Sequence, residues 1–470
     1  MYDLLREMNL TGYLIGGTIR DLILDRPIKD IDLAVSINPE YFLKNLSQKI
    51  KGYTICLDRE NLVFRFIAGN RISFDLSPIR GNDILEDLSK RDFTINAMAI
   101  RLEDLFGRTA SPLIHDPFKG ARDMDQKLIR AVSEKIFLDD PLRILRAFRL
   151  AGQLHYQIEI RTGALIRRDR ELLERTATER IREELFLLLS LEEGTSQGEQ
   201  LYHYGLLPIL FLRRLPEKLC PEITEHAWSL GLRNLAALEE ILADLAHSDS
   251  HSLRNLDALL SHISGHQATY KPLLKLAVLL AGFFEPEREK EMAGAVPPSQ
   301  ETEKGNLTPV DFLLRALCLT TPQRKFILTC LRGSREMLYL FRMKYKSAKY
   351  FYRFFRDHGE AGLGAAIIGL ARKKAVGAPP EIMAGLEDLF LAMICFYFAW
   401  EPKKREPILK GDFLMEHFHL SPGPEIGRLL DLLEEARAEG LVKQRDEAIR
   451  LAEELLKRND IPHDGLPPKK

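Results

Sequence analysis

Near its start the chain reads Tyr13-Leu14-Ile15-Gly16-Gly17-Thr18-Ile19-Arg20-Asp21, and the triplet Asp30-Ile31-Asp32 follows nine residues after Asp21. Residues two apart on a strand point to one face, so Asp30 and Asp32 are expected to project together. Two carboxylates about 4 Å apart repel by roughly 4 kcal/mol at an effective dielectric constant of about 20. A divalent cation offsets that repulsion, and oxygen ligands suit Mg²⁺, which binds few carboxylates together with substrate phosphates. The stretch therefore predicts a magnesium site formed by Asp30 and Asp32.

The glycine pair predicts the phosphate side of the same site. Gly16 and Gly17 let the backbone come close to a ligand. If a helix begins near Thr18, its free N–H groups present about half a positive charge to that ligand. A Gly-Gly pair alone is typical of a turn, and a lone Asp-x-Asp of a solvated strand end. Their order and spacing here favour a site for a metal and a triphosphate.

A third carboxylate is expected beside this pair. Residues 62–67 and 72–76 are largely apolar and flank Gly69-Asn70, which is a hairpin signal. Asp75 then lies on a strand that we expect to run beside Asp30 and Asp32, where it would complete a metal site. Taken alone, Asp75 would be interpreted as an acid on the surface of a strand.

Length and composition bound the class of protein. The chain has 470 residues, from which two to four domains are expected, and a formal net charge of −1. Nucleic-acid binding would therefore depend on local basic patches. The five cysteines are scattered without metal-binding spacing, and the N-terminus has no signal-peptide pattern, so we expect reduced thiols and a cytoplasmic location. The apolar run 389–400 is expected to be a buried helix too short to span a bilayer, so no membrane partner is expected.

The two parts of the chain differ in their expected structure. Residues 1 to about 120 mix strand and helix patterns, whereas the chain from about 125 onward is expected to be almost entirely helical. Thr176-Ala177-Thr178-Glu179 has the pattern of a capping box before an apolar helix. Residues 293–309 are expected to form an exposed loop and residues 462–470 a disordered tail. The expected fold class is α+β, with a mixed sheet and helices at the N-terminus followed by all-α domains.

Two further segments carry charged residues in patterns suited to a nucleotide. In Lys90-Arg91-Asp92-Phe93-Thr94-Ile95-Asn96, we expect Arg91 and Asp92 to pair and face a ribose, with Asn96 one helical turn beyond Asp92. A helix start with solvated charges is the alternative for this segment alone.

The second segment is Asp139-Asp140-Pro141-Leu142-Arg143, which continues to Arg149. Pro141 fits the first position of a helix and Asp140 its cap. Arg143, Arg146 and Arg149 are spaced by three, which predicts one cationic stripe or, alternatively, an ordinary solvated face. An aspartate and an arginine together distinguish base edges, so Asp140 and Arg143 are the candidate base-reading pair.

Together these segments resemble the class II tRNA nucleotidyltransferase and bacterial poly(A) polymerase family. GGTIRD with DID resembles its metal-and-triphosphate motif, KRDFTINAMA its ribose motif, DPFKG its hinge motif and DDPLRILRAFR its base-reading motif. Thr178-Glu179-Arg180-Ile181 resembles the helical motif that supports the neck, and segments near residues 409–412 and 422–427 resemble the tail. The resemblance runs from about residue 10 to 455 and is densest before residue 190.

The resemblance implies a nucleotidyltransferase head over 1–122, a helical neck with the base-reading motif over 123–200, a helical body over 201–400 and a helical tail over 401–470. It implies template-independent addition of nucleotides to an RNA 3′ end, with Mg²⁺ as cofactor and CTP and ATP as candidate substrates. The implied residue roles follow the motifs. The catalytic residues are Asp30, Asp32 and Asp75, of which Asp30 and Asp32 hold the metal; Gly16, Gly17, Arg20 and Asp21 bind triphosphate; Arg91, Asp92 and Asn96 bind ribose; Asp140, Arg143 and Arg146 read the base; and Arg180 supports the neck.

Three departures from the family pattern are informative. Asp139 replaces the usual Glu, which leaves Asp140 and Arg143 intact, and Lys119 replaces a hinge glycine, which is expected to stiffen the hinge. The connection over 81–90 is short. Family members that complete the CCA end usually carry a longer flexible loop there, so the sequence favours CC addition over full CCA addition. A harmless deletion, or another loop that takes its place, is the alternative.

The body differs from that of many relatives. Its segment 274–284 lacks the His-Asp pair of an HD phosphohydrolase, so we expect helical scaffold without a metal. We interpret His226 as a structural histidine, with the remnant of an upstream metal ligand as the alternative. Basic and aromatic residues interleave over 324–356, which suits phosphate contacts along an RNA duplex. Candidate RNA-binding residues are Arg342, Lys344, Lys346 and Lys349. A basic amphipathic face over a core is the alternative.

A tRNA acceptor arm is the RNA implied by the resemblance, and CC addition from CTP is the favoured activity. Full CCA addition and poly(A) polymerase activity stay open as alternatives from the same family. A non-catalytic RNA-binding protein predicts a damaged metal motif, whereas Asp30 and Asp32 are intact. The sequence leaves the oligomeric state open.

Overall fold

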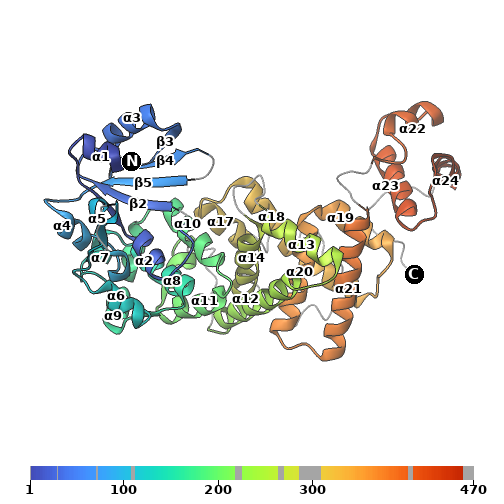
Figure 1. Ribbon diagram of the computed structural model, residues 1–470. Coiled ribbons are helices and arrows are strands. Elements are labelled where there is room, and N and C mark those ends of the chain that lie inside the picture. The colour runs from blue at the N-terminus through green and yellow to red at the C-terminus, as the bar shows by residue number, and fades with distance from the viewer. Residues whose placement is uncertain are drawn as a thin grey trace. The chain divides into compact units, whose positions relative to one another are not determined.

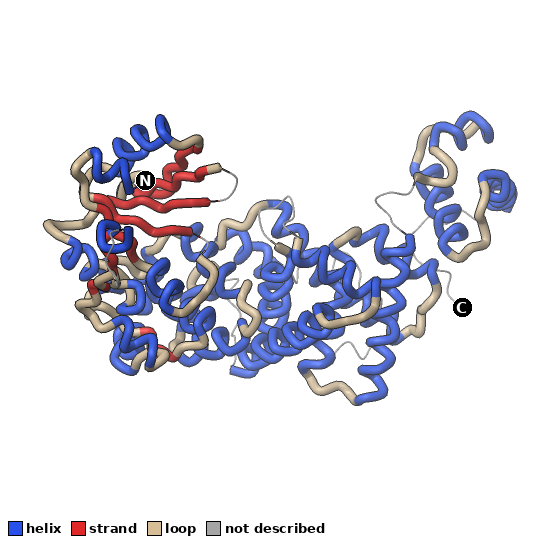
Figure 2. The backbone as a smooth tube through the Cα atoms, in the orientation of Figure 1, coloured by secondary structure: helices blue, strands red, loops and turns tan. Residues whose placement is uncertain are grey.

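A computed structural model describes residues 2–28, 30–69, 72–106, 112–216, 225–262, 269–284, 308–400 and 406–458. The chain divides into two compact units, Met1–Arg213 and Arg214–Lys470, which are described separately. Strands lie in the first unit, and the second is helical (Figures 1 and 2). The expected α+β fold class is confirmed.

The N-terminal unit is built on a seven-stranded mixed sheet with the order β3-β4-β5-β2-β1-β6-β7. Its strands are β1 (Gly12–Ile15), β2 (Asp30–Val35), β3 (Gly52–Asp58), β4 (Val63–Ala68), β5 (Ile72–Pro78), β6 (Ala99–Arg101) and β7 (Ile114–His115). β2 pairs with β5 in parallel, whereas the other pairs are antiparallel. The parallel pair lies in the middle of the sheet, where both strands have neighbours on each side.

The register of the central strands fulfils two predictions. β4 and β5 form the expected hairpin, with Phe66 opposite Phe74. In the parallel β2–β5 pair, Asp32 lies opposite Asp75. The strand that carries Asp75 therefore runs directly beside the strand that carries Asp30 and Asp32, as predicted.

Helices and short turns complete the N-terminal unit. They are α1 (Tyr2–Glu7), α2 (Gly17–Ile23), α3 (Pro39–Lys49), α4 (Ile84–Ser89), η1 (Thr94–Asn96), α5 (Leu102–Phe106), α6 (Gly120–Asp125), α7 (Ile136–Asp139), α8 (Arg143–Leu154), α9 (Ile160–Asp169), η2 (Arg170–Arg175), α10 (Thr178–Leu189), α11 (Gly194–His203) and η3 (Pro208–Leu212). Helix α3 packs on β3, β4 and β5, and Phe42 on α3 and Phe66 on β4 are fully buried. Burial of such large aromatic groups stabilises this layer, since each contributes a few kcal/mol.

Two local predictions for this unit were wrong. The region expected to be all helix contains a short parallel strand pair, β8 (Leu128–Ile129) with β9 (Gln157–Ile158). The expected capping box also fails, because α10 begins at Thr178 after Ala177 and no side chain caps it. Both features depend on distant backbone partners or on φ/ψ angles that a short motif does not specify.

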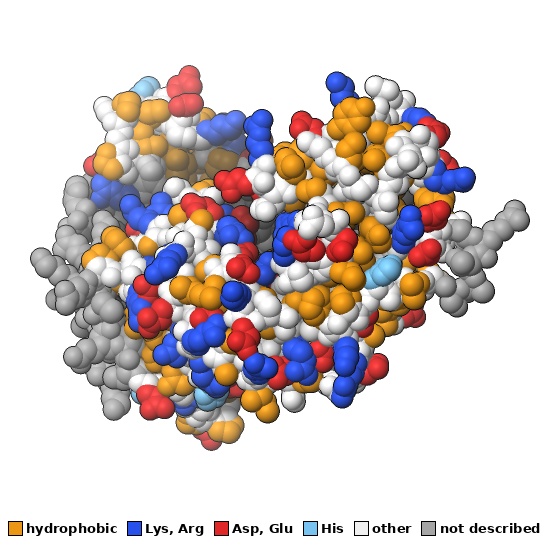
Figure 3. All heavy atoms as spheres, turned by 90° about the vertical axis from the view of Figure 1, so that its left-hand side faces the viewer, with side chains coloured by type: hydrophobic (Ala, Val, Ile, Leu, Met, Phe, Trp, Pro, Cys, Tyr) orange, Lys and Arg blue, Asp and Glu red, His pale blue; other side chains and the backbone are white. Residues whose placement is uncertain are grey.

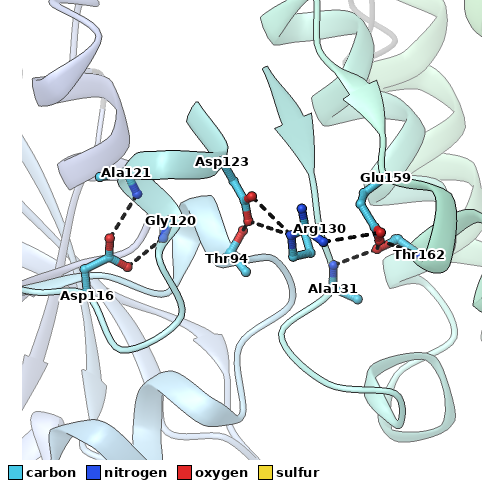
Figure 4. Close-up of polar contacts among 9 residues, drawn as sticks. All are labelled: Thr94, Asp116, Gly120, Ala121, Asp123, Arg130, Ala131, Glu159 and Thr162. Carbon is cyan, nitrogen blue, oxygen red and sulfur yellow. Dashed lines mark hydrogen bonds and ion pairs between the residues drawn. The ribbon is translucent and has the colours of Figure 1, made fainter. Parts of the chain in front are cut away.

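The segment after β7 is held by a chain of hydrogen bonds (Figure 4). Asp116 accepts from the backbone N–H groups of Gly120, at 2.7 Å, and Ala121, at 3.0 Å, at the start of α6. Asp123 accepts from the Thr94 hydroxyl at 2.7 Å and binds Arg130 at 3.0 Å. Arg130 continues the chain to Glu159, at 3.2 Å, which caps α9.

Lys119 and Gly120 belong to the DPFKG segment, which resembles the hinge motif of the family, and their backbones are constrained in different ways. Lys119 adopts a left-handed conformation with φ of 61°, which glycine adopts at lower cost. A Cβ added to Gly120 would lie 2.2 Å from the carbonyl oxygen of Thr94. The chain therefore keeps glycine where the backbones touch and places a lysine at the strained position.

The C-terminal unit consists of helices in its described residues. They are α12 (Glu225–Ala246), α13 (His251–Ser261), α14 (Tyr270–Phe284), α17 (Thr308–Ala316), α18 (Thr321–Arg342), α19 (Ala348–His358), α20 (Ala361–Ala375), α21 (Pro380–Trp400), α22 (Gly411–Phe418), α23 (Pro424–Ala438) and α24 (Arg445–Arg458). Helices α12 and α14 pack closely, and a Cβ added to Gly282 would lie 2.3 Å from backbone atoms of Gly231. The expected loop over 293–309 lies outside the described residues up to 307, as does the expected tail over 462–470.

Helix α21 differs from its prediction. It begins at Pro380 and has 21 residues, so by length and composition alone it would suffice to cross a membrane. Leu389, Met393 and Ile394 are fully buried, while Leu391 is 41% exposed. The run over 389–400 is thus part of a longer core helix with one buried face. Core helices often have such composition, so the feature is weak evidence for membrane insertion.

We predict that Gly120→Ala destabilises the N-terminal unit by about 1–3 kcal/mol, because the new methyl group must displace the backbone of Thr94. Amide hydrogen exchange in β1 and β6 measures this loss. Lys119→Gly is the neighbouring control and should leave protection equal or higher by up to about 1 kcal/mol, because it relieves a left-handed residue. Equal effects of the two substitutions would contradict the prediction.

In the C-terminal unit, we predict that Gly282→Ala lowers the free energy of unfolding by about 1–3 kcal/mol, since its Cβ would meet the backbone of α12. The two tryptophans, Trp228 and Trp400, both lie in this unit and report its urea unfolding by fluorescence. Gly427→Ala on α23, where an added Cβ meets nothing within 4 Å, should raise stability slightly through helix propensity. A destabilised Gly427→Ala or an unaffected Gly282→Ala would overturn this account.

Candidate active site

A cavity of about 1390 Å³ lies within the N-terminal unit. It is lined by residues from the β1–α2 turn, β2, β5, the approach to η1, the start of α8 and the η2–α10 connection. Most residues singled out in the sequence line this one cavity: Gly16, Gly17, Arg20, Asp32, Asp75, Arg91, Asp92, Asn96, Asp140, Arg143, Arg146 and Arg180. Asp21 and Asp30 are not in its lining.

The carboxylates lie together on β2 and β5. Burial, followed by the negative charge of Asp75, raises the pKa of Asp32 to about 6, with a smaller contribution from Asp30. The raised pKa of Asp32 records the cost of keeping a charged carboxylate buried and close to other acids. A cluster of carboxylate oxygens suits a hard divalent cation, whose charge would offset the repulsion between them.

An arginine that the sequence did not single out lies between two of these acids. Arg65 on β4 binds both oxygens of Asp75, at 2.7 and 2.8 Å, and one oxygen of Asp30 at 2.9 Å. Asp30 also accepts a short hydrogen bond from the hydroxyl of Ser73. Among the described residues, accordingly, no three His, Cys, Asp or Glu side chains are arranged as a ready-made metal cluster.

The glycine turn lies against Asp32, and α2 begins at Gly17, one residue before the predicted start. Gly16 has φ of 66°, and a Cβ added there would lie 2.9 Å from Arg91 and 3.5 Å from the Asp32 carboxylate. A Cβ on Gly17 would lie 3.4 Å from the guanidinium of Arg20. The absence of side chains at both positions thus brings backbone, arginines and carboxylate to one wall of the cavity.

Arg20 joins the turn to the predicted ribose residues. Its guanidinium pairs with Asp21 through two bonds of 2.9 Å and donates to Asn96 at 2.8 Å. Asn96 in turn donates to Asp92 at 3.2 Å, but the expected helical turn between them was wrong, because Phe93 is extended and only Thr94–Asn96 form a 3₁₀ turn. Asp21 therefore orients Arg20 from outside the cavity lining.

The expected pairing of Arg91 with Asp92 was wrong. Arg91 binds Asp87 at 2.9 Å, and Asp92 binds Arg146 at 2.9 Å. Burial alone would raise the pKa of Asp92, but Arg146 and hydrogen bonds hold it below its ordinary value. Adjacent residues at the start of a short turn point to different partners, and both partners here come from other elements.

Asp87 on α4 was another residue missed by the sequence analysis. Its side chain is nearly fully buried, and it also accepts from the backbone N–H of Arg80 at 3.0 Å. Asp87 thus joins the short connection after β5 to Arg91. The only signal in the sequence was an acid four residues before an arginine, the spacing of an ion pair along a helix.

The base-reading candidates lie at the start of α8. The helix begins at Arg143, two residues after the predicted Pro141, and Asp140 accepts from the N–H of Leu142 at 3.2 Å. Asp140 also pairs with Arg180 at 2.9 Å, while Arg143 donates to the carbonyl of Lys90 at 2.9 Å. The Nη1 of Arg143 is buried and has no hydrogen-bond partner among the described residues. One donor of Arg143, a residue of the cavity lining, is therefore buried without a hydrogen-bond partner among the described residues.

The predicted cationic stripe on α8 is largely neutralised, because two of its arginines form ion pairs with acids. Arg146 pairs with Asp92, and Arg149 pairs with Glu184 on α10 at 2.8 Å. The face of the molecule seen in Figure 3 likewise shows Lys and Arg side chains mixed with Asp and Glu. Two of the three arginines on α8 thus connect elements of the N-terminal unit.

The RNA-binding candidates lie in the C-terminal unit around the α18–α19 connection. Arg342, Lys344 and Lys346 are exposed, whereas Lys349 approaches Glu435 of α23 at 3.8 Å. Arg353 binds the same Glu435 through two bonds, of 2.5 and 2.8 Å. The later part of the basic stretch is thus paired with acids that lie about 80 residues away in sequence, as the amphipathic alternative expects.

The aromatic residues of this stretch divide in the same way. Phe351, Phe354 and Phe355 are buried in the core, and the rings of Tyr345 and Tyr350 stack with their centroids 4.2 Å apart.

The segment that lacks the His-Asp pair of an HD phosphohydrolase lies on α14, where Ala281 is buried. His226, the histidine interpreted as structural, is exposed on α12.

Comparisons with known proteins agree with this geometry. Family models match residues 12–130, described as "Poly A polymerase head domain", and 155–218, described as "Probable RNA and SrmB- binding site of polymerase A". A CC-adding tRNA nucleotidyltransferase from Geobacter sulfurreducens is 30% identical over 454 residues, covering 95% of this chain and 93% of its own length. A CCA-adding enzyme from Streptococcus uberis is 26% identical over 465 residues, with coverage of 94% and 92%.

Solved structures share the fold. An apo form of a CCA-adding enzyme has a TM-score of 0.66 at 20% identity and covers 97% of this chain, with 92% of its own chain matched. The Thermotoga maritima CCA-adding enzyme complexed with tRNA has a TM-score of 0.63 at 21% identity, with 96% and 93% covered. With a relative 30% identical over nearly its whole length, the chain belongs to the class II tRNA nucleotidyltransferase family.

Proposed function

We propose that this enzyme adds cytidines to the 3′ end of tRNA, using CTP and Mg²⁺ and releasing pyrophosphate. The observation that carries the proposal is the convergence of Asp32, Asp75, Asp92 and Arg143 on one cavity. A nucleoside triphosphate needs contacts to phosphate, ribose and base at once, and this cavity offers candidate groups for each. Family membership supports the reaction class.

Each group of residues has a distinct part in the proposed reaction. The RNA 3′-hydroxyl attacks the α-phosphate in line, so that a new O–P bond forms as the bond to pyrophosphate breaks. Asp30 and Asp32, with Asp75 beside them, would hold Mg²⁺, which supplies charge neutralisation at the phosphate and activates the hydroxyl. Gly16, Gly17 and Arg20, the last oriented by Asp21, would bind the triphosphate.

Ribose and base are assigned to the other charged residues that line the cavity. Arg91, Asp92 and Asn96 would hold the ribose, with Asp92 kept ionised by its partners. Asp140 and Arg143 would read the base edge, and Arg146 holds Asp92 in place. Arg180 supports the neck by pairing with Asp140, which restricts the acceptor oxygens of the base reader.

The connection after β5 supports CC addition rather than full CCA addition. Between Pro78 and Arg91 the chain forms only a short turn and the six-residue helix α4, capped by Asp83. Asp87 on this helix holds Arg91. The relative from Geobacter sulfurreducens carries a CC-adding name, whereas other relatives are named CCA-adding enzymes. Full CCA addition is the second candidate, and poly(A) polymerase activity is the third.

The remaining assignments follow from the same family. We propose a head over 1–122, a neck over 123–200, a body over 201–400 and a tail over 401–470, with a cytoplasmic location. Arg342, Lys344, Lys346 and Lys349 would contact phosphates of the tRNA acceptor arm.

We predict that Asp30→Ala reduces nucleotide transfer by on the order of a thousandfold or more, because several kcal/mol of charge stabilisation at the phosphate would be lost. Radiolabelled CTP incorporation measures transfer, and filter binding should show largely unchanged affinity for tRNA. Asp125→Ala, an exposed carboxylate of α6, is the matched control with normal activity. Retained transfer in Asp30→Ala would refute the metal role of Asp30.

For specificity, we predict that tRNA lacking its three 3′-terminal nucleotides gains two nucleotides with CTP and no more when ATP is added. Gel analysis of the product, with tRNA already ending in CC as a second substrate, measures each step separately. A product with a terminal A would establish full CCA addition instead. Long A tails on unstructured RNA would identify a poly(A) polymerase.

A further inference from the structure

Arg65 is placed on the carboxylates by the register of the sheet. It lies opposite Asp75 in the antiparallel β4–β5 pair, and Asp75 lies opposite Asp32 in the parallel β5–β2 pair. Its Nε and Nη2 bind the two oxygens of Asp75, and Nη2 also binds Asp30. A planar guanidinium bound to both oxygens of a carboxylate fixes the orientation of that carboxylate.

As a result of this contact, the three acids differ in how many of their carboxylate oxygens are hydrogen-bonded. Both oxygens of Asp75 are engaged by Arg65, and the two oxygens of Asp30 bind Arg65 and Ser73. Among the described residues, none donates a hydrogen bond to the Asp32 carboxylate, whose nearby arginines are bound elsewhere. The guanidinium of an arginine stays protonated in proteins, so Arg65 brings a positive charge to these two acids.

We propose that Arg65 is a positioning residue and built-in counter-ion of the active site, which stabilises Asp30 and Asp75 without metal and competes with a divalent cation for their oxygens. The inference rests on the proposed metal role of these carboxylates. Wild-type affinity for the cation is then lower than three free carboxylates would give, because binding at Asp30 or Asp75 requires Arg65 to release oxygens. In exchange, the metal-free sheet avoids the repulsion of three unneutralised acids.

Because Arg65 and the cation compete for the same oxygens, removing the guanidinium should have two opposite effects, one on stability and one on metal binding. Removing the guanidinium leaves three negative charges together, so the metal-free protein must become less stable. The same removal frees the oxygens of Asp75 and Asp30 and eliminates a like charge near the cation, so divalent binding must become tighter. A side chain with a merely structural role in the sheet would lower stability without tightening metal binding.

The test uses the full chain with Arg65→Gln and, as matched control, Arg101→Gln on β6 of the same sheet, whose guanidinium pairs with exposed Glu103. Thermal melting in chelator, and calorimetric titration with MgCl₂ and MnCl₂, are the readouts, and neither depends on activity. For Arg65→Gln we expect a lower melting temperature in chelator, a larger rise on adding Mg²⁺ and about tenfold or more tighter Mn²⁺ binding. Arg101→Gln should match wild type in all three.

A second variant separates folding from charge. In Arg65→Gln/Asp75→Asn one carboxylate charge is also removed, so the chelator melting temperature should return toward wild type. If Arg65→Gln does not fold in chelator, recovery by Mg²⁺ or by Asp75→Asn supports the proposal, and recovery by neither overturns it. Unchanged or weaker Mn²⁺ binding in Arg65→Gln also overturns it. A wild-type protein that binds neither Mg²⁺ nor Mn²⁺ would instead refute the proposed metal role itself.

Discussion

The parallel pairing of β2 with β5 is the constraint on which the rest of the proposed active site depends. It puts Asp32 opposite Asp75, and β4 then puts Arg65 opposite Asp75. A one-residue shift of either pair would turn these side chains to the other face of the sheet. Buried apolar residues on the same strands, such as Leu33 and Leu76, fix the register through the core. Hydrophobic packing thus enforces an unfavourable cluster of charges.

Whether a feature depends on local or on distant residues explains how well it could be predicted from the sequence. The alternation on β2 and the hairpin signal before Asp75 are local, so the strands and the placement of Asp75 beside Asp32 were predicted correctly. The starts of α2 and α8 were predicted within about two residues, since turn glycines and prolines act on their own backbone. The strand pair β8–β9 was missed because its hydrogen-bond partners lie about 29 residues apart.

Charged partners were predicted least well, and the reason is physical. Arg91 and Asp92 are adjacent, yet each pairs with a residue on another element, Asp87 and Arg146. Neighbouring residues point in different directions from a turn, whereas burial forces each charge to find some partner. The ion pairs of Arg65 with Asp30 and of Arg353 with Glu435 follow the same rule, because each joins residues that lie on separate elements and far apart in the sequence.

This rule gives the arginines of the N-terminal unit a common role. Arg20, Arg91 and Arg146 each pair with one acid and Arg65 pairs with two, whereas Asp32, whose pKa burial raises to about 6, receives no such bond among the described residues. Ion pairs at partly buried positions contribute little net stability, but they fix side-chain orientation. A site that accepts a highly charged triphosphate and a cation, as proposed for this cavity, needs its own charges held in place beforehand. Under the proposed function, the surrounding arginines would preorganise the site, and Asp32 would keep a charge free for a cation.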